Sequence, residues 1–241
     1  MERNYDHERE IMEKLTAFDT PTITNVTATY PNDKENCLGL YHPWNGKWYT
    51  DQSLKCMYPD LGRKVGYAVT CTFGMPCNDF GRLGLSDLLK AIDASPNPVV
   101  VVIKQNMPEA VKRRNGLVGG NMMTAFKSLG TVAVISDGPS RDLDEIRPMG
   151  LQYMLTGVVA GHGDFAIESI NAPVDICGMM VAPGDIIHMD ENGATKFPPA
   201  YLDAVLERAF KLQEIEAKRQ KMMSETKDIS EILKIFGGMY D

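Results

Sequence analysis

Short apolar runs rich in β-branched residues alternate with amphipathic stretches along much of the chain. The runs have strand length and lie between turn-forming residues, whereas the amphipathic stretches repeat their apolar positions with the period of a helix. Val99 to Ile103 (VVVVI) and Thr131 to Ser136 (TVAVIS) are apolar almost throughout, which is typical of strands buried on both faces. The pattern therefore predicts an α/β fold.

The remaining elements follow from the same periodicities, and strands cluster late in the chain before a long helix. We expect one α/β domain over residues 1–200 and a C-terminal helical extension over residues 201–241. Further strands are expected at Tyr67–Phe73, Leu151–Val159, Asp175–Val181 and Asp185–Met189. Helices are expected at Asp6–Leu15, Thr22–Ala28, Ser86–Ala94, Asn121–Leu129, Pro198–Ser224 and within residues 228–241.

Residues 31–62 interrupt this pattern with aromatic side chains set among glycines, prolines and asparagines. We interpret them as an inserted loop packed by its own aromatic residues. A lid or a subunit contact that shapes a pocket is the alternative. His42 is expected to be a hydrogen-bonded loop residue rather than a catalytic base.

The stretch from Gly116 to Glu145 combines a glycine-rich loop, a helix, a buried strand and a tight turn. Gly119 and Gly120 open the helix, and Gly130 is expected to end it, because glycine adopts the left-handed conformation without a steric penalty. The charged pair Arg141-Asp142 then follows at the carboxyl end of the strand, where open α/β sheets bind ligands.

These residue types suit the binding of an anion and a metal. Free N–H groups at a helix start bind anions, and glycines let a carboxylate approach the main chain. Arg141 offers a planar donor pair for a carboxylate or a 2-oxo acid, and Asp142 is a hard oxygen ligand for Mg²⁺ or Mn²⁺. The residues alone leave a simpler interpretation open, in which Arg141 and Asp142 only cap a helix that begins near Leu143.

Composition and charge argue against several classes of protein. Of the 241 residues, 44% are hydrophobic and 24% are charged, which is ordinary for a globular protein. A net charge of −7 argues against a nucleic-acid-binding protein. No apolar run is long enough to span a membrane, and the charged N-terminal segment does not resemble a secretory signal.

The five cysteines are odd in number and form no CxxC pair, so neither a disulfide framework nor a zinc site is indicated. Cys71 and Cys177 lie in apolar runs and are expected to be buried thiols. A reducing cytoplasmic location fits this pattern.

A glycine, a twenty-residue spacer, Arg-Asp, two residues and an acidic residue occur in order at Gly120, Arg141, Asp142 and Glu145. Together with the Asp137-Gly138 turn, this stretch resembles the RraA-like family, which includes the 4-hydroxy-4-methyl-2-oxoglutarate class II aldolases. The similarity covers roughly residues 15 to 200. Three further segments carry it: Phe18–Val26, Val65–Thr72 and Val174–Gly193.

The resemblance implies a single swivelling β/β/α domain with N-terminal helices and a C-terminal helical extension. The family usually assembles as homotrimers, or as homohexamers made of two trimers, with the site between subunits. The implied activity is that of a divalent-metal-dependent carbon–carbon lyase acting on a small 2-oxo acid. The reaction would be retro-aldol cleavage of a 4-hydroxy-2-oxo acid to pyruvate, oxaloacetate decarboxylation, or both, through a metal-stabilised enolate.

The resemblance also suggests roles for individual residues. Asp142 would hold Mg²⁺ or Mn²⁺, Arg141 would bind the carboxylate or oxo oxygen, and Glu145 would orient a metal-bound water. The general base is not assigned. The substrate carboxylate would be bound by the backbone amides of Gly119, Gly120, Asn121 and Met122. His162 and Asp137 are further candidates for the pocket.

The sequence departs from the family pattern at two positions, and two alternative functions stay open. Members of the aldolase branch often carry an acidic residue where this chain has Gly120, and the family usually has an aspartate where this chain has Asn25. Lys104 is the lysine placed best for a Schiff base, but we favour the metal-dependent mechanism over a Schiff-base mechanism. The chain could instead be a non-catalytic RraA-like protein that binds a ribonuclease or another partner, although Asp142 favours an enzyme. An enzyme acting on a sugar-derived acid is the second alternative.

Overall fold

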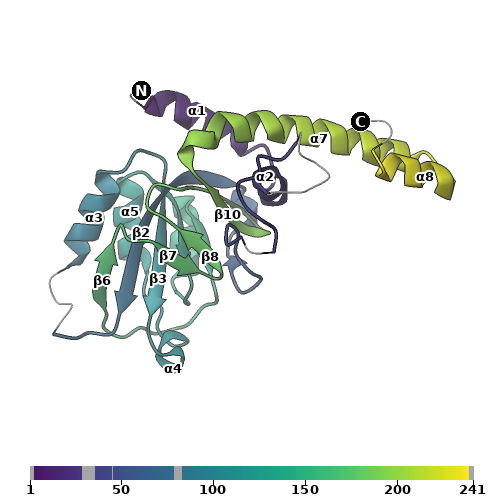
Figure 1. The fold of residues 1–241 in the computed structure, drawn as a ribbon. Helices are drawn as coiled ribbons and strands as arrows, with labels where there is room; N and C mark the ends of the chain where they lie inside the picture. Colours follow the sequence, from purple (N-terminus) through teal and green to yellow (C-terminus); the bar gives the residue numbers. More distant parts are fainter. Residues whose placement is uncertain (1–2, 29–35, 45, 79–82, 239–241) are drawn as a thin grey trace.

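A mixed eight-stranded sheet forms the centre of the molecule. The computed structural model describes residues 3–28, 36–44, 46–78 and 83–238. The strand order is β1-β5-β4-β3-β2-β9-β10, and β6 also pairs with β2 (Figure 1). The strands are β1 (Lys55–Cys56), β2 (Lys64–Gly74), β3 (Val99–Asn106), β4 (Thr131–Ser136), β5 (Gln152–Leu155), β6 (Ala166–Ile170), β9 (Ile186–Asp190) and β10 (Gly193–Phe197).

Strands β2 to β5 are parallel neighbours, so their carboxyl ends meet at one edge of the sheet. The other strand pairs of the sheet are antiparallel. Along its second edge, β2 pairs with β9 through residues 64–67 and with β6 through residues 71–74. β2 therefore holds three other strands in register.

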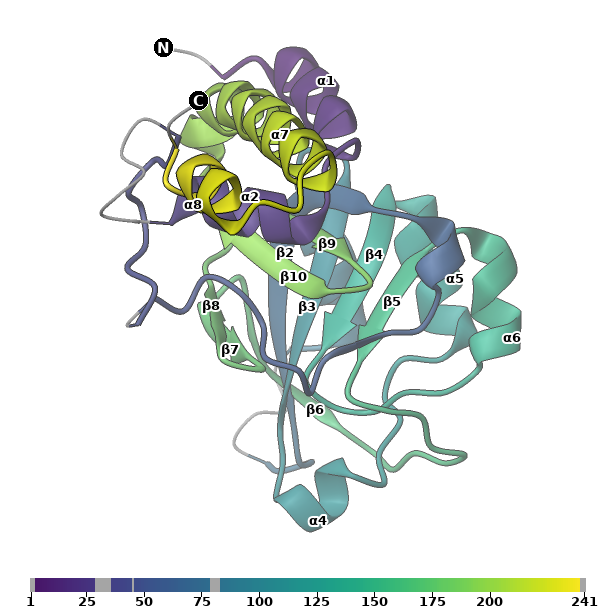
Figure 2. The same cartoon turned by 90° about the vertical axis from the view of Figure 1, so that its right-hand side faces the viewer.

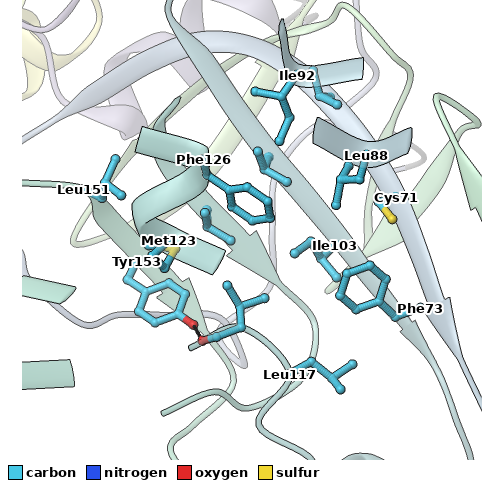
Figure 3. Close-up of a cluster of buried hydrophobic side chains, with 14 of the residues drawn as sticks. Cys71, Phe73, Leu88, Ile92, Ile103, Leu117, Met123, Phe126, Leu151 and Tyr153 are labelled. Atoms are coloured by element: carbon cyan, nitrogen blue, oxygen red, sulfur yellow. Dashed lines mark hydrogen bonds between the residues drawn. The ribbon is translucent and has the colours of Figure 1, made fainter. Parts of the chain in front are cut away.

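One face of the sheet is covered by helices α3 (Leu85–Asp93) and α5 (Gly120–Ser128). Figure 3 shows this core, which includes Phe126 and Met123 from α5 and Ile103 of β3. The other face is covered by the hairpin of β7 (Val174–Ile176) and β8 (Met179–Val181), whose apolar side chains pack against Val100 and Val102. The sheet is thus buried on both faces, as its apolar strands predict.

Helices from both ends of the chain form a third layer over β9 and β10 (Figure 2). The layer consists of α1 (Tyr5–Leu15), α2 (Thr20–Thr27) and α7 (Leu202–Ser224), and α7 contacts both of the others. Beyond this layer, α7 extends away from the sheet and α8 (Ile229–Phe236) packs against it (Figure 1). No helix in the described part of the chain combines the length and the apolar character needed to span a membrane. The short helical elements are η1 (Pro59–Leu61), α4 (Glu109–Lys112), α6 (Leu143–Ile146), η2 (Arg147–Met149) and η3 (Pro199–Tyr201).

Tyr41, Trp48 and Tyr49 of the 31–62 segment pack on one another, whereas Tyr58 stacks on Tyr153 of β5. Tyr41 stacks on the buried Trp48 with ring centroids 5.4 Å apart, and Trp48 donates its indole N–H to the Thr24 carbonyl at 3.3 Å. Trp44, in contrast, is 88% exposed. Residues 31–35 and 45 of this segment, like residues 239–241 of the predicted extension, lie outside the described residues. The domain boundary at residue 200 stays a prediction.

Two of the predicted late strands and the burial predicted for Cys177 were wrong. The predicted strand Leu151–Val159 ends at Leu155, and its second half is a loop. The predicted strand Asp175–Val181 is a hairpin that turns at Cys177 and Gly178, both with positive φ. Cys177 is therefore a half-buried turn residue rather than a core thiol. Strands β6 and β10 were not predicted.

Candidate functional site

Buried hydroxyl groups hold the glycine-rich loop that precedes α5. Leu117 and Val118 are buried, and the carbonyl oxygen of Val118 accepts hydrogen bonds from Ser140 Oγ and Tyr153 Oη. Burial raises the pKa of Tyr153, so its hydroxyl remains a donor. Because Ser140 directly precedes Arg141, this contact fixes the loop relative to the charged pair.

Asp142 is the N-cap residue of α6, but its side chain lies at the first turn of α5. It precedes α6 in the left-handed conformation (φ 61°), but its side chain makes no capping bond there. Its Oδ2 accepts instead the backbone N–H of Gly120 at 3.1 Å. The carboxylate thus points at the helix N-terminus, where the dipole favours negative charge.

Arg141 lies beside the same carboxylate. Its Nε is 3.5 Å from Asp142 Oδ2, and this nitrogen is buried without a hydrogen-bond partner. One third of the Arg141 side chain remains exposed. A buried donor without an acceptor is unfavourable, so the guanidinium is prepared for an incoming anionic oxygen.

Close approach of these side chains requires glycine at both loop positions. A Cβ on Gly119 would lie 2.5 Å from Asp142 Oδ2, and a Cβ on Gly120 would lie 2.1 Å from Glu145 Oε1. Two carboxylates and one guanidinium therefore converge on the Gly119-Gly120 backbone. Their charges sum to −1 when all three are ionised.

This donor set fits a hard divalent cation. Within residues 3–28, 36–44, 46–78 and 83–238, no group of three or more His, Cys, Asp and Glu side chains could hold a metal ion. Zn²⁺ in a structural site needs such a group, whereas Mg²⁺ is commonly held by one or two carboxylates and completes its shell with water and substrate. Asp142 at Gly119 and Glu145 at Gly120 supply the one or two carboxylates that such a Mg²⁺ site needs.

Not every predicted site residue joins this group. Asn121 and Met122 lie in the first turn of α5, where N–H groups lack a carbonyl four residues earlier in the helix. His162 is exposed, and its Nδ1 lies 3.1 Å from the Gly163 carbonyl. Asp137 is bound by Lys104 Nζ at 2.6 Å, so it belongs to a separate cluster.

Two residues that hold the site were missed at the level of sequence. The Ser140 and Tyr153 hydroxyl groups lie within hydrogen-bond distance of each other and of the Val118 carbonyl. Ser140 lies within the predicted turn, but nothing in the sequence marks a hydroxyl there as an anchor. Tyr153 lies in an apolar strand, where an aromatic residue is expected for packing alone.

A profile of the RraA-like family, described as Aldolase/RraA, matches residues 33–195. The chain belongs to the RraA-like family. The predicted fold class is confirmed by RraA-like solved structures, which share this mixed α/β architecture. The family includes 4-hydroxy-4-methyl-2-oxoglutarate aldolases as well as RNase inhibitors, so membership alone does not fix the activity.

Curated relatives of this RraA-like chain are distant. A Halalkalibacterium halodurans protein, provisionally named a 4-hydroxy-4-methyl-2-oxoglutarate aldolase, is 28% identical over 57% of this chain and 64% of its own length. An uncharacterized protein of Methanocaldococcus jannaschii is 25% identical over 72% of this chain and 80% of its own.

Two solved structures share the fold over nearly the whole RraA-like chain. An uncharacterized protein from Pseudomonas syringae superposes with a TM-score of 0.70 at 17% identity, covering 93% of this chain and 92% of its own. Streptomyces coelicolor RraAS2, described as an unusual member of the RNase ES inhibitor RraA protein family, gives a TM-score of 0.66 at 20% identity, with 88% and 97% covered. At these identities the likeness concerns the fold alone.

Proposed function

We propose that this RraA-like protein is a divalent-metal-dependent carbon–carbon lyase acting on a small 2-oxo acid. The observation that carries the proposal is the placement of Asp142 on the Gly120 amide with the buried Arg141 Nε beside it. A carboxylate, a guanidinium donor without a partner and a helix N-terminus are the groups needed to bind a cation and an oxo acid together.

Each group has a distinct part in this reaction. Arg141 binds the substrate carboxylate or its oxo oxygen and favours negative charge that develops there. The amides of Asn121 and Met122 remain for the carboxylate, because the Gly120 amide is taken by Asp142. Asp142, supported by Glu145, would hold Mg²⁺ or Mn²⁺, which supplies Lewis acidity toward the 2-oxo group.

The proposed substrates are oxo acids that release pyruvate. The C3–C4 bond of a 4-hydroxy-2-oxo acid would break as its 4-hydroxyl group gives up a proton, which releases the second oxo compound. The pyruvate enolate that is left would take up a proton at C3 to give pyruvate. Oxaloacetate would lose carbon dioxide through the same bond. Membership in a family that contains 4-hydroxy-4-methyl-2-oxoglutarate aldolases supports this substrate class.

We further propose that the protein forms a homo-oligomer, a trimer or a hexamer. Large apolar side chains are exposed on the C-terminal helices, including Phe210 at 54% and Phe236 at 73%. Exposed patches of this kind commonly mark protein contacts. Sedimentation equilibrium tests the proposal, and a protein that stays monomeric at micromolar concentration would refute it.

Pyruvate release from oxaloacetate and from 4-hydroxy-4-methyl-2-oxoglutarate, with Mg²⁺ and then with EDTA, tests the lyase activity. In Asp142→Asn the amide oxygen can still accept the Gly120 N–H, but the ligand charge is lost. We expect kcat to fall at least about 100-fold, as for other charge-stabilising groups. Asp144→Asn, an exposed change two residues away, should leave the rate unchanged.

Equal rates in the wild type and Asp142→Asn would rule out the proposed metal site. A folded wild type that releases no pyruvate from either compound would argue against this substrate class. Binding to a ribonuclease, tested by inhibition of RNA cleavage, would then become the favoured activity.

A further inference from the structure

A cavity opens on the opposite face of the sheet from α5, beneath the β7–β8 hairpin. It has a volume of about 480 Å³. Its walls come from the carboxyl ends of β3 and β4, from α4, from the loop after β5 and from the β7–β8 turn. Arg141, Asp142 and Glu145 are not among the lining residues, which include Lys104, Lys112, Arg113, Asp137, Thr156 and Cys177.

The cavity contains two ammonium groups that share one carboxylate oxygen. Asp137 Oδ2 lies 2.6 Å from Lys104 Nζ and 2.7 Å from Lys112 Nζ, and its Oδ1 accepts the Gln105 N–H at 2.7 Å. The Asp137 side chain is 4% exposed. Two positive charges therefore meet one negative charge, and the partly desolvated cluster keeps a surplus of one positive charge.

The other charged groups in the walls are already paired. Arg113 bonds Glu109 at 2.7 Å, and Asp175 bonds Lys47 at 3.2 Å. Glu109 lies within electrostatic range of Lys112, but Glu109 and Asp175 form their ion pairs with Arg113 and Lys47 and not with Lys104 or Lys112. Among the described residues, Asp137 is therefore the carboxylate that bonds the two lysines.

We propose that this cavity binds a small oxyanion, held by Lys104 and Lys112. Each ammonium group has three donors, of which Asp137 uses one, so further donors remain for a ligand. The side chains of Lys104 and Lys112 are 32% and 17% exposed, which leaves them accessible but shields their charge from bulk water. The volume is ample for a carboxylate or a phosphate.

The site is separate from the proposed lyase site, although the two share a wall. The Ser140 N–H bonds the Gly157 carbonyl at 3.2 Å, and the Val159 N–H bonds the Ser140 carbonyl at 2.9 Å. Gly157 and Val159 line the cavity, and Ser140 precedes Arg141. Phosphate binding does not depend on the proposed reaction, so either proposal can fail alone.

Titration calorimetry with inorganic phosphate, in EDTA and at constant ionic strength, tests the site. We expect saturable binding to the wild type and an affinity reduced at least about tenfold in Lys112→Met, in which Lys104 still pairs with Asp137. Asp137→Asn keeps the acceptor for Gln105 but frees both lysines, so phosphate should bind about tenfold more tightly. Lys90→Met, an exposed lysine of α3, is the matched control and should bind like the wild type.

Three results would overturn the proposal. The first is an absence of saturable binding to the wild type. The second is binding that survives Lys112→Met but is lost in Arg141→Gln, which would place the anion at the glycine loop. The third is weaker binding in a folded Asp137→Asn. If Asp137→Asn does not fold, Lys104→Met replaces it as the test. The proposal requires Lys104→Met to weaken phosphate binding as Lys112→Met does, and unchanged binding would overturn it.

Discussion

The Glu145 carboxylate fills the space that a side chain at residue 120 would occupy at the start of α5. A Cβ at position 120 would lie 2.1 Å from Glu145 Oε1, but that oxygen is the end of a flexible side chain. The Glu145 side chain can therefore turn away at little cost to stability. The absence of a side chain at residue 120 permits the Glu145 carboxylate to lie against the first turn of α5.

We predict that Gly120→Ala changes function more than stability. Alanine at the first helical position should alter the free energy of unfolding by no more than about 1 kcal/mol. Displacement of Glu145 should weaken Mn²⁺ binding about tenfold, as loss of a supporting group does. Calorimetric metal titration and thermal unfolding measure the two effects.

Gly163→Ala is the matched control, since no atom lies within 4 Å of its Cβ position. Metal affinity should be unchanged in that variant. If Gly120→Ala binds Mn²⁺ as tightly as the wild type, Glu145 has no part in the site.

At the scale of elements, the glycine loop takes its position from β5 and from the turn after β4. Tyr153 of β5 and Ser140 of the turn both bond the Val118 carbonyl. Val118 precedes Gly119, so a shift of its carbonyl is transmitted to the first turn of α5.

We predict that Tyr153→Phe slows pyruvate formation about tenfold, because loss of one anchor lets the loop leave its reactive position. Ser140 still bonds the carbonyl, so the free energy of unfolding should fall by only about 1 kcal/mol. Steady-state kinetics and chemical denaturation separate the two effects. Tyr67→Phe removes a hydroxyl that bonds Glu8 in another layer, and it should not alter kcat.

The sequence predicted the elements whose local patterns agree with their tertiary surroundings. Helices α1 and α5 and strand β4 fall within one residue of the expected ranges. Strand β10 (GATKF) and strand β6 (AIESI) were missed because polar residues interrupt them, and their pairing with distant strands decides their structure. The β7–β8 turn was missed because Cys177 and Gly178 lie within an apolar run.

The candidate site was predictable to a similar extent. Gly119 and Gly120 precede helix α5, and Arg141 and Asp142 follow strand β4, so one αβ unit suffices to bring them together. The Ser140–Tyr153 anchor and the Lys104–Asp137–Lys112 cluster join segments that no local pattern connects. Only the packed structure reveals them.

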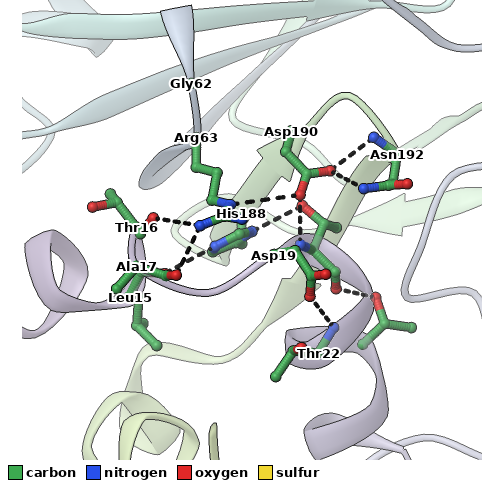
Figure 4. A network of polar contacts seen from close by, with 12 residues as sticks. Leu15, Thr16, Ala17, Asp19, Thr22, Gly62, Arg63, His188, Asp190 and Asn192 are labelled. Carbon is green, nitrogen blue, oxygen red and sulfur yellow. Dashed lines mark hydrogen bonds and ion pairs between the residues drawn. The ribbon is translucent and has the colours of Figure 1, made fainter. Parts of the chain in front are cut away.

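At the scale of the whole molecule, a buried polar network joins the N-terminal helices to the sheet (Figure 4). His188 of β9 lies fully buried, with Nδ1 3.0 Å from Thr20 Oγ1 and Nε2 3.2 Å from the Leu15 carbonyl. A carbonyl only accepts, so Nε2 carries the proton and Nδ1 accepts the Thr20 hydroxyl. Asp190 accepts the Thr20 N–H at 2.7 Å.

We predict that the protein loses stability in mild acid through His188. Burial lowers the pKa of His188 to about 4, against 6.5 in the unfolded chain. The unfolded state therefore binds the proton first, and stability that is complete above pH 6.5 declines as the pH falls toward 4. The loss amounts to about 3 kcal/mol.

Denaturant unfolding at pH 7 and pH 4.5 measures this loss. His188→Gln should be less stable at pH 7 but should show a smaller difference between the two pH values. His162→Asn, which changes an exposed histidine, should keep the dependence of the wild type. An equal pH dependence in His188→Gln would assign the acid sensitivity to other groups.

Strand β2 and the N-terminal helices can reach their final packing only after later parts of the chain have been synthesised. Residues 64–67 of β2 pair with residues 186–189 of β9, and α1 and α2 pack on α7, so these segments are synthesised well before the segments that cover them. Contacts of such long sequence separation slow folding and leave apolar surface uncovered meanwhile. A chain stalled at residue 197 should therefore be cleaved rapidly by protease within residues 5–27, whereas the completed chain should resist. Nascent copies of this protein are thus expected to depend on chaperones until α7 has been made.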